Sequence, residues 1–417
     1  MRATTLLTEI LGLKQTTVVG LEFTPEGLVA DVKPRKRRAR CGECGRKVRG
    51  YDRRGSRRWR HLSLAGLDVW LRYDIRRVDC SACGVRVEQV PWAERESDFT
   101  LPFEEMTAYL TQRTDRTTVS NMMRISWTTV GSIVARVMAR MGPTDRLEGL
   151  RCIGVDELSY RRHHEYVTVV IDHRSGNVVW VGEGKSSDTL KQFFVALGAD
   201  RAALLEAVTI DLSAAYIKAV TEASPAALLV FDRFHVQRLA HEAVDEVRRA
   251  ETRVLSTAED RQILKGIRFA LQKNPWNLLR SERIKLTLLQ RENRRIYRAY
   301  LLKEALLDIL DRHQVGVAAQ KLDEWCRWAM RSRLRPFKKL ARTLRRHRDG
   351  ILAYVQTRLN NGRTEGLNGK IRVITRRAFG FHNVSSLIGM IFLCCSGLNL
   401  TPLHRTPSPS IVPVPTR

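Results

Sequence analysis

The sequence predicts a mixed α/β protein with a large helical part, and three observations lead to this expectation. Between residues 151 and 235, short apolar runs rich in β-branched residues alternate with helical patterns in the order β-β-β-α-β-α-β. Residues 236–359 are highly charged and helix-forming, with almost no strand pattern. Two Cys-x-x-Cys pairs lie within residues 41–92. We therefore expect an α/β core, a long all-α segment and a small N-terminal metal-binding module.

Composition limits the classes of protein to which the chain can belong. The 417 residues predict about two or three domains of roughly 150 residues each, and a hydrophobic content of 43% supports folded cores. The formal net charge of +28 predicts salt-sensitive binding to a polyanion, above all nucleic acid. The N-terminus has no signal-peptide pattern, and Ser, Asn and Gly interrupt the apolar stretch at 383–403. We expect a cytoplasmic protein with a buried C-terminal helix and no membrane span.

Changes of pattern along the chain predict seven segments. The first is basic, the second holds the cysteine pairs, and the third is typical of paired helices. The α/β core follows in two parts, on either side of the all-α segment, and the last segment has the Pro- and Ser-rich composition of a disordered tail. The expected bounds are 1–40, 41–92, 98–141, 150–235, 236–359, 360–400 and 401–417.

The two cysteine pairs predict a structural zinc site. Cys41 and Cys44 form one pair, Cys80 and Cys83 form the other, and a Gly follows each pair. Two such turns supply the four thiolates of a closed tetrahedral site, and a strand hairpin fills the 35 residues between them. A redox role is the alternative, but it needs only one pair beside a βαβ unit. His61 is a conceivable substitute ligand, although four cysteines already close the site.

Residues 117–140 predict a helix-turn-helix. Ser126 is suited to cap the second helix, and Arg124 stands near the turn, where a Gly is commonly expected. The apolar positions of the two helices recur at helical spacing and include Val119, Met122 or Met123, Ile125, Val130, Ile133, Val134, Val137 and Met138. In this motif the second helix enters the major groove of DNA. The residues expected at its exposed start are Trp127, Thr128 and Thr129.

Three carboxylates close short motifs, namely Asp156 in IGVDELSY, Asp211 in VTIDLSAAY and Glu365 in NNGRTEGLNGK. Asp156 is expected at the end of the first strand and Asp211 at the end of the fourth, and in an RNase H-like fold these strands are neighbours. Three converging carboxylates suit two Mg (or Mn) ions. Two such ions, roughly 3.5–4 Å apart, clamp both reacting oxygens of a phosphodiester.

The 153 residues between Asp211 and Glu365 are too many for a loop in a compact domain. We interpret them as an all-α insertion, after which the chain returns to deliver Glu365 on a helix. The alternative for each aspartate alone is a turn or helix cap, the usual role of Asp at a strand end. Asp172, which ends the run YVTVVID, is expected to have that structural role.

Together these motifs resemble the transposases of the ISL-three family of bacterial insertion sequences. The resemblance covers nearly the whole chain and includes both cysteine pairs, ISWTTV, IGVDELSY, TIDLSAAY, VFDRFHV and SRLRPFKKLARTL. Its most specific part is NNGRTEGLNGKIRVITRRAFGF. It implies an RNase H-like nuclease and strand transferase of the DDE type, with Asp156, Asp211 and Glu365 as the catalytic triad. The chain departs from the family in the Gly-less turn near Arg124 and in its low-complexity C-terminus.

Further residues near these motifs have two interpretations each. Asp232 and His235, in DRFHV, either support the active site or act as a helix cap and a packed histidine. Trp325 and Trp328 are interpreted as core residues, with base stacking as the alternative. Basic residues around Glu365 are expected to follow a DNA backbone, although some form only a solvated face; they are Arg363, Lys370, Arg372, Arg376 and Arg377.

The sequence as a whole predicts a DNA transposase that binds the terminal inverted repeats of its element, cleaves the ends and joins the 3′-hydroxyls to target DNA. Two ends must be paired, so a homodimer or a larger assembly on DNA is expected. One alternative is a non-catalytic DNA-binding regulator or relic derived from a transposase, against which the intact triad argues. Another is an RNase H-like hydrolase without strand transfer, which the N-terminal DNA-binding modules and the long insertion disfavour.

Overall fold

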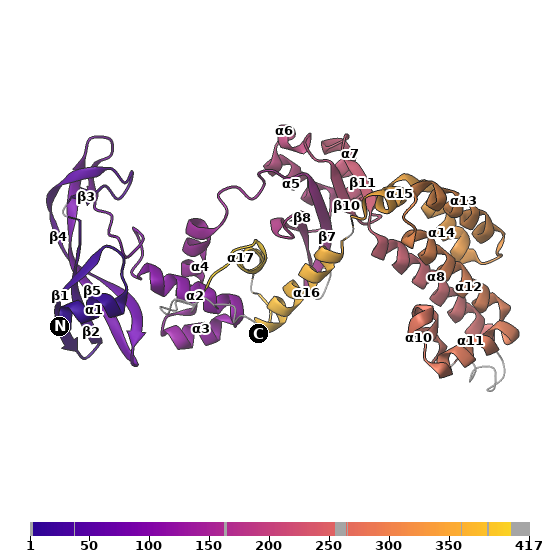
Figure 1. Cartoon of the computed structure of the whole chain (residues 1–417), viewed down its shortest axis with the longest axis horizontal. Coiled ribbons are helices and arrows are strands. Elements are labelled where there is room, and N and C mark those ends of the chain that lie inside the picture. The colour runs from indigo at the N-terminus through magenta and orange to yellow at the C-terminus, as the bar shows by residue number, and fades with distance from the viewer. Residues whose placement is uncertain are drawn as a thin grey trace, which may run out of the picture. The chain divides into compact units, whose positions relative to one another are not determined.

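The computed structural model describes residues 3–36, 38–161, 165–254, 264, 266–359, 361–381 and 383–401. The chain divides into two compact units (Figure 1). The first comprises Met1–Gly142 together with Leu398–Arg417, and the second comprises Pro143–Gly397. Apart from Thr401, the predicted tail 401–417 lies outside the described residues.

A six-stranded sheet dominates the first unit, in the order β1-β2-β5-β4-β3 with β6 paired to β5. Its elements are α1 (Ala3–Leu11), β1 (Thr16–Thr24), β2 (Gly27–Pro34), β3 (Ala39–Arg40), β4 (Lys47–Leu64), β5 (Leu67–Cys80) and β6 (Gly84–Val87). The hairpin of β4 and β5 fills the interval between the cysteine pairs, as expected. Because β2 pairs in parallel with β5, the segments 1–40 and 41–92 share one sheet rather than forming separate parts.

Three helices complete the first unit, namely α2 (Leu101–Arg113), α3 (Arg116–Met123) and α4 (Trp127–Met141). The apolar face predicted for α4 is buried, with Val130, Ile133 and Val137 fully enclosed. The turn before α4 forms without Gly, because Arg124 adopts the left-handed conformation that Gly commonly supplies there, at φ 53° and ψ 49°. Ser126 then caps α4 by accepting a hydrogen bond from the backbone N–H of Thr129, as predicted (3.1 Å).

The second unit begins with a five-stranded sheet in the order β11-β10-β7-β8-β9. The predicted order of elements is confirmed, with one additional short helix, α6; the bounds are β7 (Cys152–Arg161), β8 (Glu165–Asp172), β9 (Val178–Glu183), α5 (Ser187–Leu197), α6 (Ala199–Ala202), β10 (Ala207–Ile210), α7 (Ala214–Ala223) and β11 (Leu228–Phe231). Strands β7, β8 and β9 are antiparallel, whereas β7, β10 and β11 are parallel. Asp156 does not end its strand as expected, because pairing with β8 continues β7 to Arg161.

Helices follow the sheet through the described residues up to Thr357. They are α8 (Arg233–Val254), α10 (Ile267–Gln272), the 3-10 turn η1 (Pro275–Asn277), α11 (Arg280–Glu292), α12 (Arg294–Asp311), α13 (Val315–Arg331), α14 (Arg335–Arg346) and α15 (Arg348–Thr357). Helix α8 packs on α12 and α14, and α15 returns to pack on β11. The buried apolar residues of the sheet and of these helices form one continuous core. The pattern of residues 236–359 thus gives helices, as predicted.

The two tryptophans of α13 differ in their surroundings. Trp325 is buried and donates its indole N–H to the carbonyl oxygen of Leu302 (2.7 Å), so its predicted core role is confirmed. Trp328 is 39% exposed and lines an open cavity of about 990 Å³ together with Trp276. The core role predicted for Trp328 is therefore wrong, because its helical position faces this opening rather than the packed side of α13.

Two helices close the second unit, α16 (Gly362–Arg377) and α17 (Val384–Cys395). Helix α16 packs against β7, and α17 packs against β9 and α16. The apolar stretch at 383–403 thus forms a largely buried helix, with Leu387, Ile391 and Leu393 fully enclosed. Within the described ranges, none of the helices has both the length and the apolar character that a membrane crossing requires.

Candidate catalytic and zinc-binding sites

The three predicted catalytic carboxylates come from the sheet and from α16. Asp156 lies within β7, and Asp211 is the first residue after β10. In the parallel pairing of these strands Thr209 lies opposite Gly154. Two residues further along, the same register sets Asp211 beside Asp156, on the same face of the sheet. Glu365 lies exposed in the first turn of α16, so the expected delivery of this residue on a helix is seen.

One hydrogen bond joins α16 directly to this part of the sheet. Asn368 is buried and donates from its side-chain nitrogen to Oδ2 of Asp156 (2.8 Å). The other oxygen of Asp156 accepts from the backbone N–H of Glu157 (2.8 Å). Because Asn368 follows Glu365 by three residues, the two side chains are neighbours on the helix surface. The contact between Asn368 and Asp156 therefore turns the Glu365 face of α16 toward β7.

The electrostatics show that the acidic groups share one region. Burial raises the pKa of Asp156, and the charges of Asp232 and Asp211 raise it further. Burial lowers the pKa of His235, and Asp156, Asp211 and Glu365 all oppose that shift, so His235 is within electrostatic range of the whole triad. In the part of the chain that the structure describes, no Lys or Arg forms an ion pair with Asp156, Asp211 or Glu365. In a chain of net charge +28 this is a concentrated negative region without direct ion pairs to the triad, although Arg238 acts on Asp232 from a distance.

Asp232 and His235 take part in this region in different ways. Asp232 is 2% exposed, and burial raises its pKa. Its Oδ1 accepts from the backbone N–H of Asn361 (3.2 Å), which links the start of α8 to the start of α16. His235 Nε2 lies 3.9 Å from Oδ2 of Asp232, and its Nδ1 has no hydrogen-bond partner among the described atoms. Both residues thus face the acidic region, although Asp232 also has a structural contact.

A buried hydrogen-bond chain that the sequence did not predict lies beneath the carboxylates. Thr209 donates its hydroxyl to Oδ1 of Asn361 (2.6 Å), and Asn361 donates from Nδ2 to the carbonyl of Val155 (3.3 Å). Nε2 of His173 lies 2.6 Å from the Thr209 hydroxyl oxygen. Since that hydroxyl has one proton, His173 Nε2 must be the donor here. A Cβ at Gly154 would lie only 3.0 Å from Asn361 Oδ1, so Gly allows this close approach.

This chain of hydrogen bonds ties the first turn of α16 to β7 and β10, the strands that carry the two aspartates. The only sequence signal for it was the NNG that precedes Glu365, since Thr209 and His173 lie in ordinary strand-end patterns.

Asp172 has the structural role expected of it, because its carboxylate accepts from the backbone N–H groups of Arg174 (3.0 Å) and Ser175 (2.9 Å).

The five basic residues predicted to follow DNA fall into two groups. Arg363 donates to the backbone carbonyls of His173 and Arg174, and Lys370 donates to that of Cys394. These two side chains therefore hold α16 in place in this structure. Arg372 and Arg376 are exposed on one face of α16, whereas Arg377 is half-buried. Arg372 and Arg376 are therefore exposed, as the predicted contact with a DNA backbone requires.

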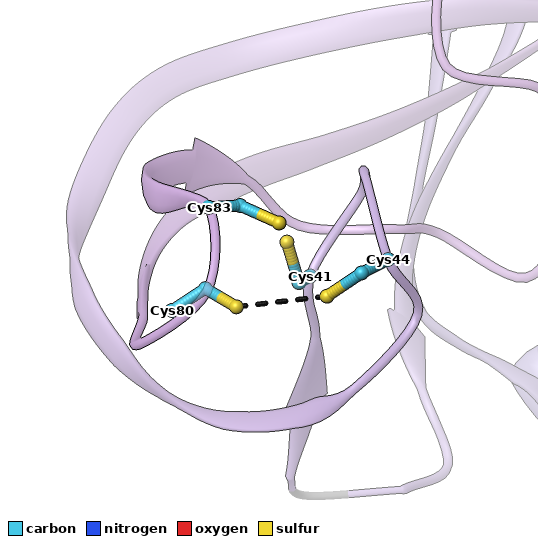
Figure 2. Close-up of side chains that lie close together, drawn as sticks. All are labelled: Cys41, Cys44, Cys80 and Cys83. Carbon is cyan, nitrogen blue, oxygen red and sulfur yellow. Dashed lines mark hydrogen bonds between the residues drawn. The ribbon is translucent and has the colours of Figure 1, made fainter.

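The four cysteines of the first unit converge (Figure 2). Their Sγ atoms all lie within 4.8 Å of one another, and Cys44 Sγ is 3.6 Å from Cys80 Sγ. Tetrahedral zinc with Zn–S bonds of about 2.3 Å sets its sulfurs about 3.8 Å apart, so the donor set fits this metal. The backbone N–H groups of Ala82 and Cys83 lower the pKa of Cys80 to about 7, whereas the nearby Cys44 sulfur raises that of Cys83 to about 12.

The turns at both cysteine pairs explain the Gly that follows each. Gly45 and Gly84 have φ of 69° and 71°, a backbone conformation that side chains disfavour. His61 is not a ligand, because it is buried elsewhere with Nδ1 2.8 Å from the Thr100 hydroxyl. Among the residues that the structure describes, the four cysteines alone bring their ligand atoms together this closely. The triad carboxylates do not come this close to one another.

The residues expected at the start of the recognition helix are at the surface. Trp127 is 41% exposed, and the Arg116 guanidinium lies 4.8 Å from the centre of its ring. Thr128 is exposed, whereas Thr129 is half-buried and its hydroxyl lies 2.7 Å from Ser126 Oγ within the cap. Trp127 and Thr128 are therefore at the surface, although the Thr128 hydroxyl also lies 2.8 Å from Ser126 Oγ, so both threonines are engaged in the cap.

Comparisons with known proteins find three transposase domains in succession along the chain. Residues 153–391 match the ISL3-type transposase family model, residues 37–83 match the zinc-finger of transposase IS204/IS1001/IS1096/IS1165, and residues 88–138 match the helix-turn-helix domain of transposase family ISL3. The transposase for insertion sequence element IS1557 of Mycobacterium tuberculosis is 39% identical, covering 99% of this chain and 100% of that protein. The transposase for IS1001 of Bordetella parapertussis is 30% identical, covering 84% of this chain and 87% of that protein.

Proposed function

The chain belongs to the ISL3 family of insertion-sequence transposases, and on this premise we propose that it cleaves the ends of its own element and joins the freed 3′-hydroxyls to target DNA. Asp156, Asp211 and Glu365 form the active site for both steps. The observation that carries this proposal is geometric: the register of β7 and β10 sets Asp211 beside Asp156, and the hydrogen bond from Asn368 to Asp156 joins to them the helix α16 that bears Glu365. No covalent protein–DNA intermediate is needed, so the chain supplies no nucleophile of its own.

The sheet supports an RNase H-like core as the framework for this site. Three antiparallel strands, β7 to β9, are followed by β10 and β11, which add in parallel beside β7. Helices α8 to α15 then form the all-α insertion between Asp211 and Glu365. The last helix of the insertion, α15, packs on β11. The chain thus returns to the core before it reaches Glu365, in spite of the long stretch of sequence after Asp211.

The carboxylates fit two divalent cations, Mg or Mn. Oxygen ligands without basic partners are the donor set that these ions prefer, and the raised pKa values of Asp156 and Asp232 mark a region that positive charge would stabilise. Asp156, Asp211 and Glu365 would hold the ions. When bound, such a pair lowers the pKa of a coordinated water and stabilises charge on the reacting phosphate.

The residues of the chain itself then set the geometry. Asn368 fixes the Asp156 carboxylate by a hydrogen bond, and Asn361 fixes the first turn of α16. His235 lies with its Nε2 3.9 Å from Asp232 and supports the acidic region from the start of α8. Arg372 and Arg376 follow the backbone of the donor DNA toward Glu365.

The first unit recognises the element ends. Its zinc ribbon and helix-turn-helix indicate DNA binding, and the Cys₄ group supports a structural zinc. We assign the reading of the terminal inverted repeats to the start of α4, where Trp127 and Thr128 are exposed. Because two ends must be paired before they are joined, the active form on DNA is a homodimer or a larger assembly.

A cleavage and joining assay tests the proposal. The substrate is a labelled duplex that carries the end of the element, incubated with Mg or Mn and with wild type or Glu365→Gln. Glu292→Gln is the matched control, since Glu292 is an exposed glutamate of α11 with no ion pair in the described residues. We expect metal-dependent 3′-end release and joining, lost at least a thousandfold in Glu365→Gln and retained in Glu292→Gln, with equal DNA binding. Tight binding by all three proteins with no cleavage under either metal would instead indicate a binding protein.

A further inference from the structure

One helix of the second unit has a basic face that the active site does not use. Residues 325–348 contain ten Lys and Arg residues and no Asp or Glu. Within α14, Phe337, Leu340 and Leu344 are buried against the helical core. The opposite face is exposed and carries four cations at spacings of four, three and four residues, which align them in one row along the helix; they are Arg335, Lys339, Arg342 and Arg346.

This row differs from the cations of neighbouring helices because α14 contains no Asp or Glu that could pair with it. Arg238 pairs with Glu242 on α8, Arg312 with Asp308 at the end of α12, and Lys273 with Glu282 at α11. None of the four cations of α14 forms an ion pair within the described parts of the chain. Like charges three and four residues apart destabilise a helix, so a basic row without acids is not explained by folding.

The row is extended at the end of α13 by two more arginines. Arg331 and Arg333 are exposed and likewise form no ion pair in the described structure. Arg333 adopts a left-handed conformation, at φ 59°, in the turn that leads into α14. From Arg335 to Arg346 the helix rises about 16 Å. A DNA strand passes about five phosphates over that length, since its rise is about 3.4 Å per phosphate.

We infer that the face formed by Arg331, Arg333 and the four cations of α14 binds the phosphate backbone of target DNA. The inference rests on the proposed function. Phosphate contacts by Lys and Arg carry no sequence information. A surface built from them alone therefore suits the DNA partner whose sequence is not fixed, whereas the terminal repeats have a helix-turn-helix to read them.

The test uses the full-length protein and a variant that removes four charges from the row. In the row variant, Arg335, Lys339, Arg342 and Arg346 are all replaced by Gln, which keeps helix propensity. The matched control replaces Arg280, Arg283, Arg291 and Arg294 by Gln, since these are exposed cations of α11 and α12 with no ion pair in the described chain. Circular dichroism and melting temperature check that both variants fold.

The first measurement is binding to a 30-base-pair duplex of unrelated sequence, followed by fluorescence anisotropy across salt concentrations. We expect the row variant to bind at least tenfold more weakly at about 100 mM salt, and the slope of log K against log salt to fall by about two to four. The control variant should lie within a factor of two of wild type. Equal slopes and affinities for the row variant and wild type would overturn the inference.

The second measurement distinguishes target DNA from the flanking DNA of the donor. Joining of a pre-cleaved element end to a plasmid should fall in the row variant and recover at high plasmid concentration, while cleavage of the intact donor stays unchanged. A loss of donor cleavage with normal joining would overturn the assignment to target DNA. If wild type neither cleaves nor joins but the binding difference persists, the proposed catalytic function fails while the DNA-binding face stands.

Discussion

Replacing Asn361 by Ala tests how the chain holds Glu365 in place. The Asn361 side chain is 2% exposed and joins Thr209 of β10 to the carbonyl of Val155 in β7. Its loss leaves the buried Val155 carbonyl without this donor and the Thr209 hydroxyl without its short acceptor. An unsatisfied buried group costs about 1–3 kcal/mol, and the small cavity adds to it. We expect the free energy of unfolding to fall by about 2–4 kcal/mol.

The same change should reduce catalysis in the protein that remains folded. Asn361 immediately precedes α16, and Glu365 donates its backbone N–H to the Asn361 carbonyl (2.7 Å). A shift of about 1 Å at a catalytic group costs on the order of a hundredfold in rate. We expect end cleavage well below the unfolding temperature to fall by about ten- to a hundredfold, with unchanged binding to the element end.

Urea unfolding followed by circular dichroism measures the first effect, and single-turnover cleavage of the end duplex measures the second. Asn277→Ala is the control, since Asn277 is exposed and should change stability by less than about 0.5 kcal/mol. Thr209→Val completes a double-mutant cycle, in which the coupling with Asn361→Ala should exceed about 0.5 kcal/mol. Unchanged stability in Asn361→Ala, or additive effects in the cycle, would refute the idea that this pair fixes α16.

Two further predictions concern the metal and the pH. Zinc removal by a strong chelator, or Cys80→Ser, should expose the interior of the β4–β5 hairpin to trypsin, which limited proteolysis measures; the second unit should stay resistant. Either change should also abolish binding to the element end, which anisotropy measures. Burial lowers the pKa of His173, so as the pH falls this histidine is protonated in the unfolded chain before it is protonated in the folded chain. Stability should therefore fall as the pH drops below about 6.5, and His173→Asn should lessen that loss between pH 7.5 and 5.5 in urea unfolding.

The features predicted correctly from the sequence depend on neighbours along the chain. The spacing of the cysteines, the cap at Ser126 and the short apolar strands each follow from a few adjacent residues, and each is seen in the structure. The left-handed conformation of Arg124 was not predicted, because the turn of a helix-turn-helix commonly has Gly at this point. Other residues can adopt the left-handed conformation, but at an energetic cost.

The features that were missed depend on partners far apart in sequence. Thr209 and Asn361 are 152 residues apart, and no local pattern pairs a strand threonine with a helix-start asparagine. The parallel pairing of β2 with β5 likewise joins segments with different composition, so the boundary at residue 40 seemed real in the sequence alone. Asp156 seemed to end a strand because polar residues follow it, yet β7 continues there as the partner of β8.

The position of Glu365 depends on where the helical insertion leaves and re-enters the core. Helix α8 begins directly after Asp232, which follows β11, and α15 packs back on β11. The approach is close at Gly350, where a Cβ would lie 2.4 Å from Cδ2 of the Phe231 ring and 3.1 Å from the carbonyl oxygen of Leu229. The long helical segment from α8 to α15 therefore leaves the sheet and rejoins it at the same strand.

Gly350→Ala therefore should damage the site from a distance. The added methyl must displace α15 from β11, since neither the ring edge nor the backbone can yield freely, and overpacking costs about 1–3 kcal/mol. Gly316→Ala is the matched control, because a Cβ there meets nothing within 4 Å and Ala favours the helix α13. We expect Gly350→Ala to lower both the melting temperature and end cleavage, and Gly316→Ala to lower neither. Normal cleavage in Gly350→Ala would mean that α15 does not position α16, and that the Asn361 contacts suffice alone.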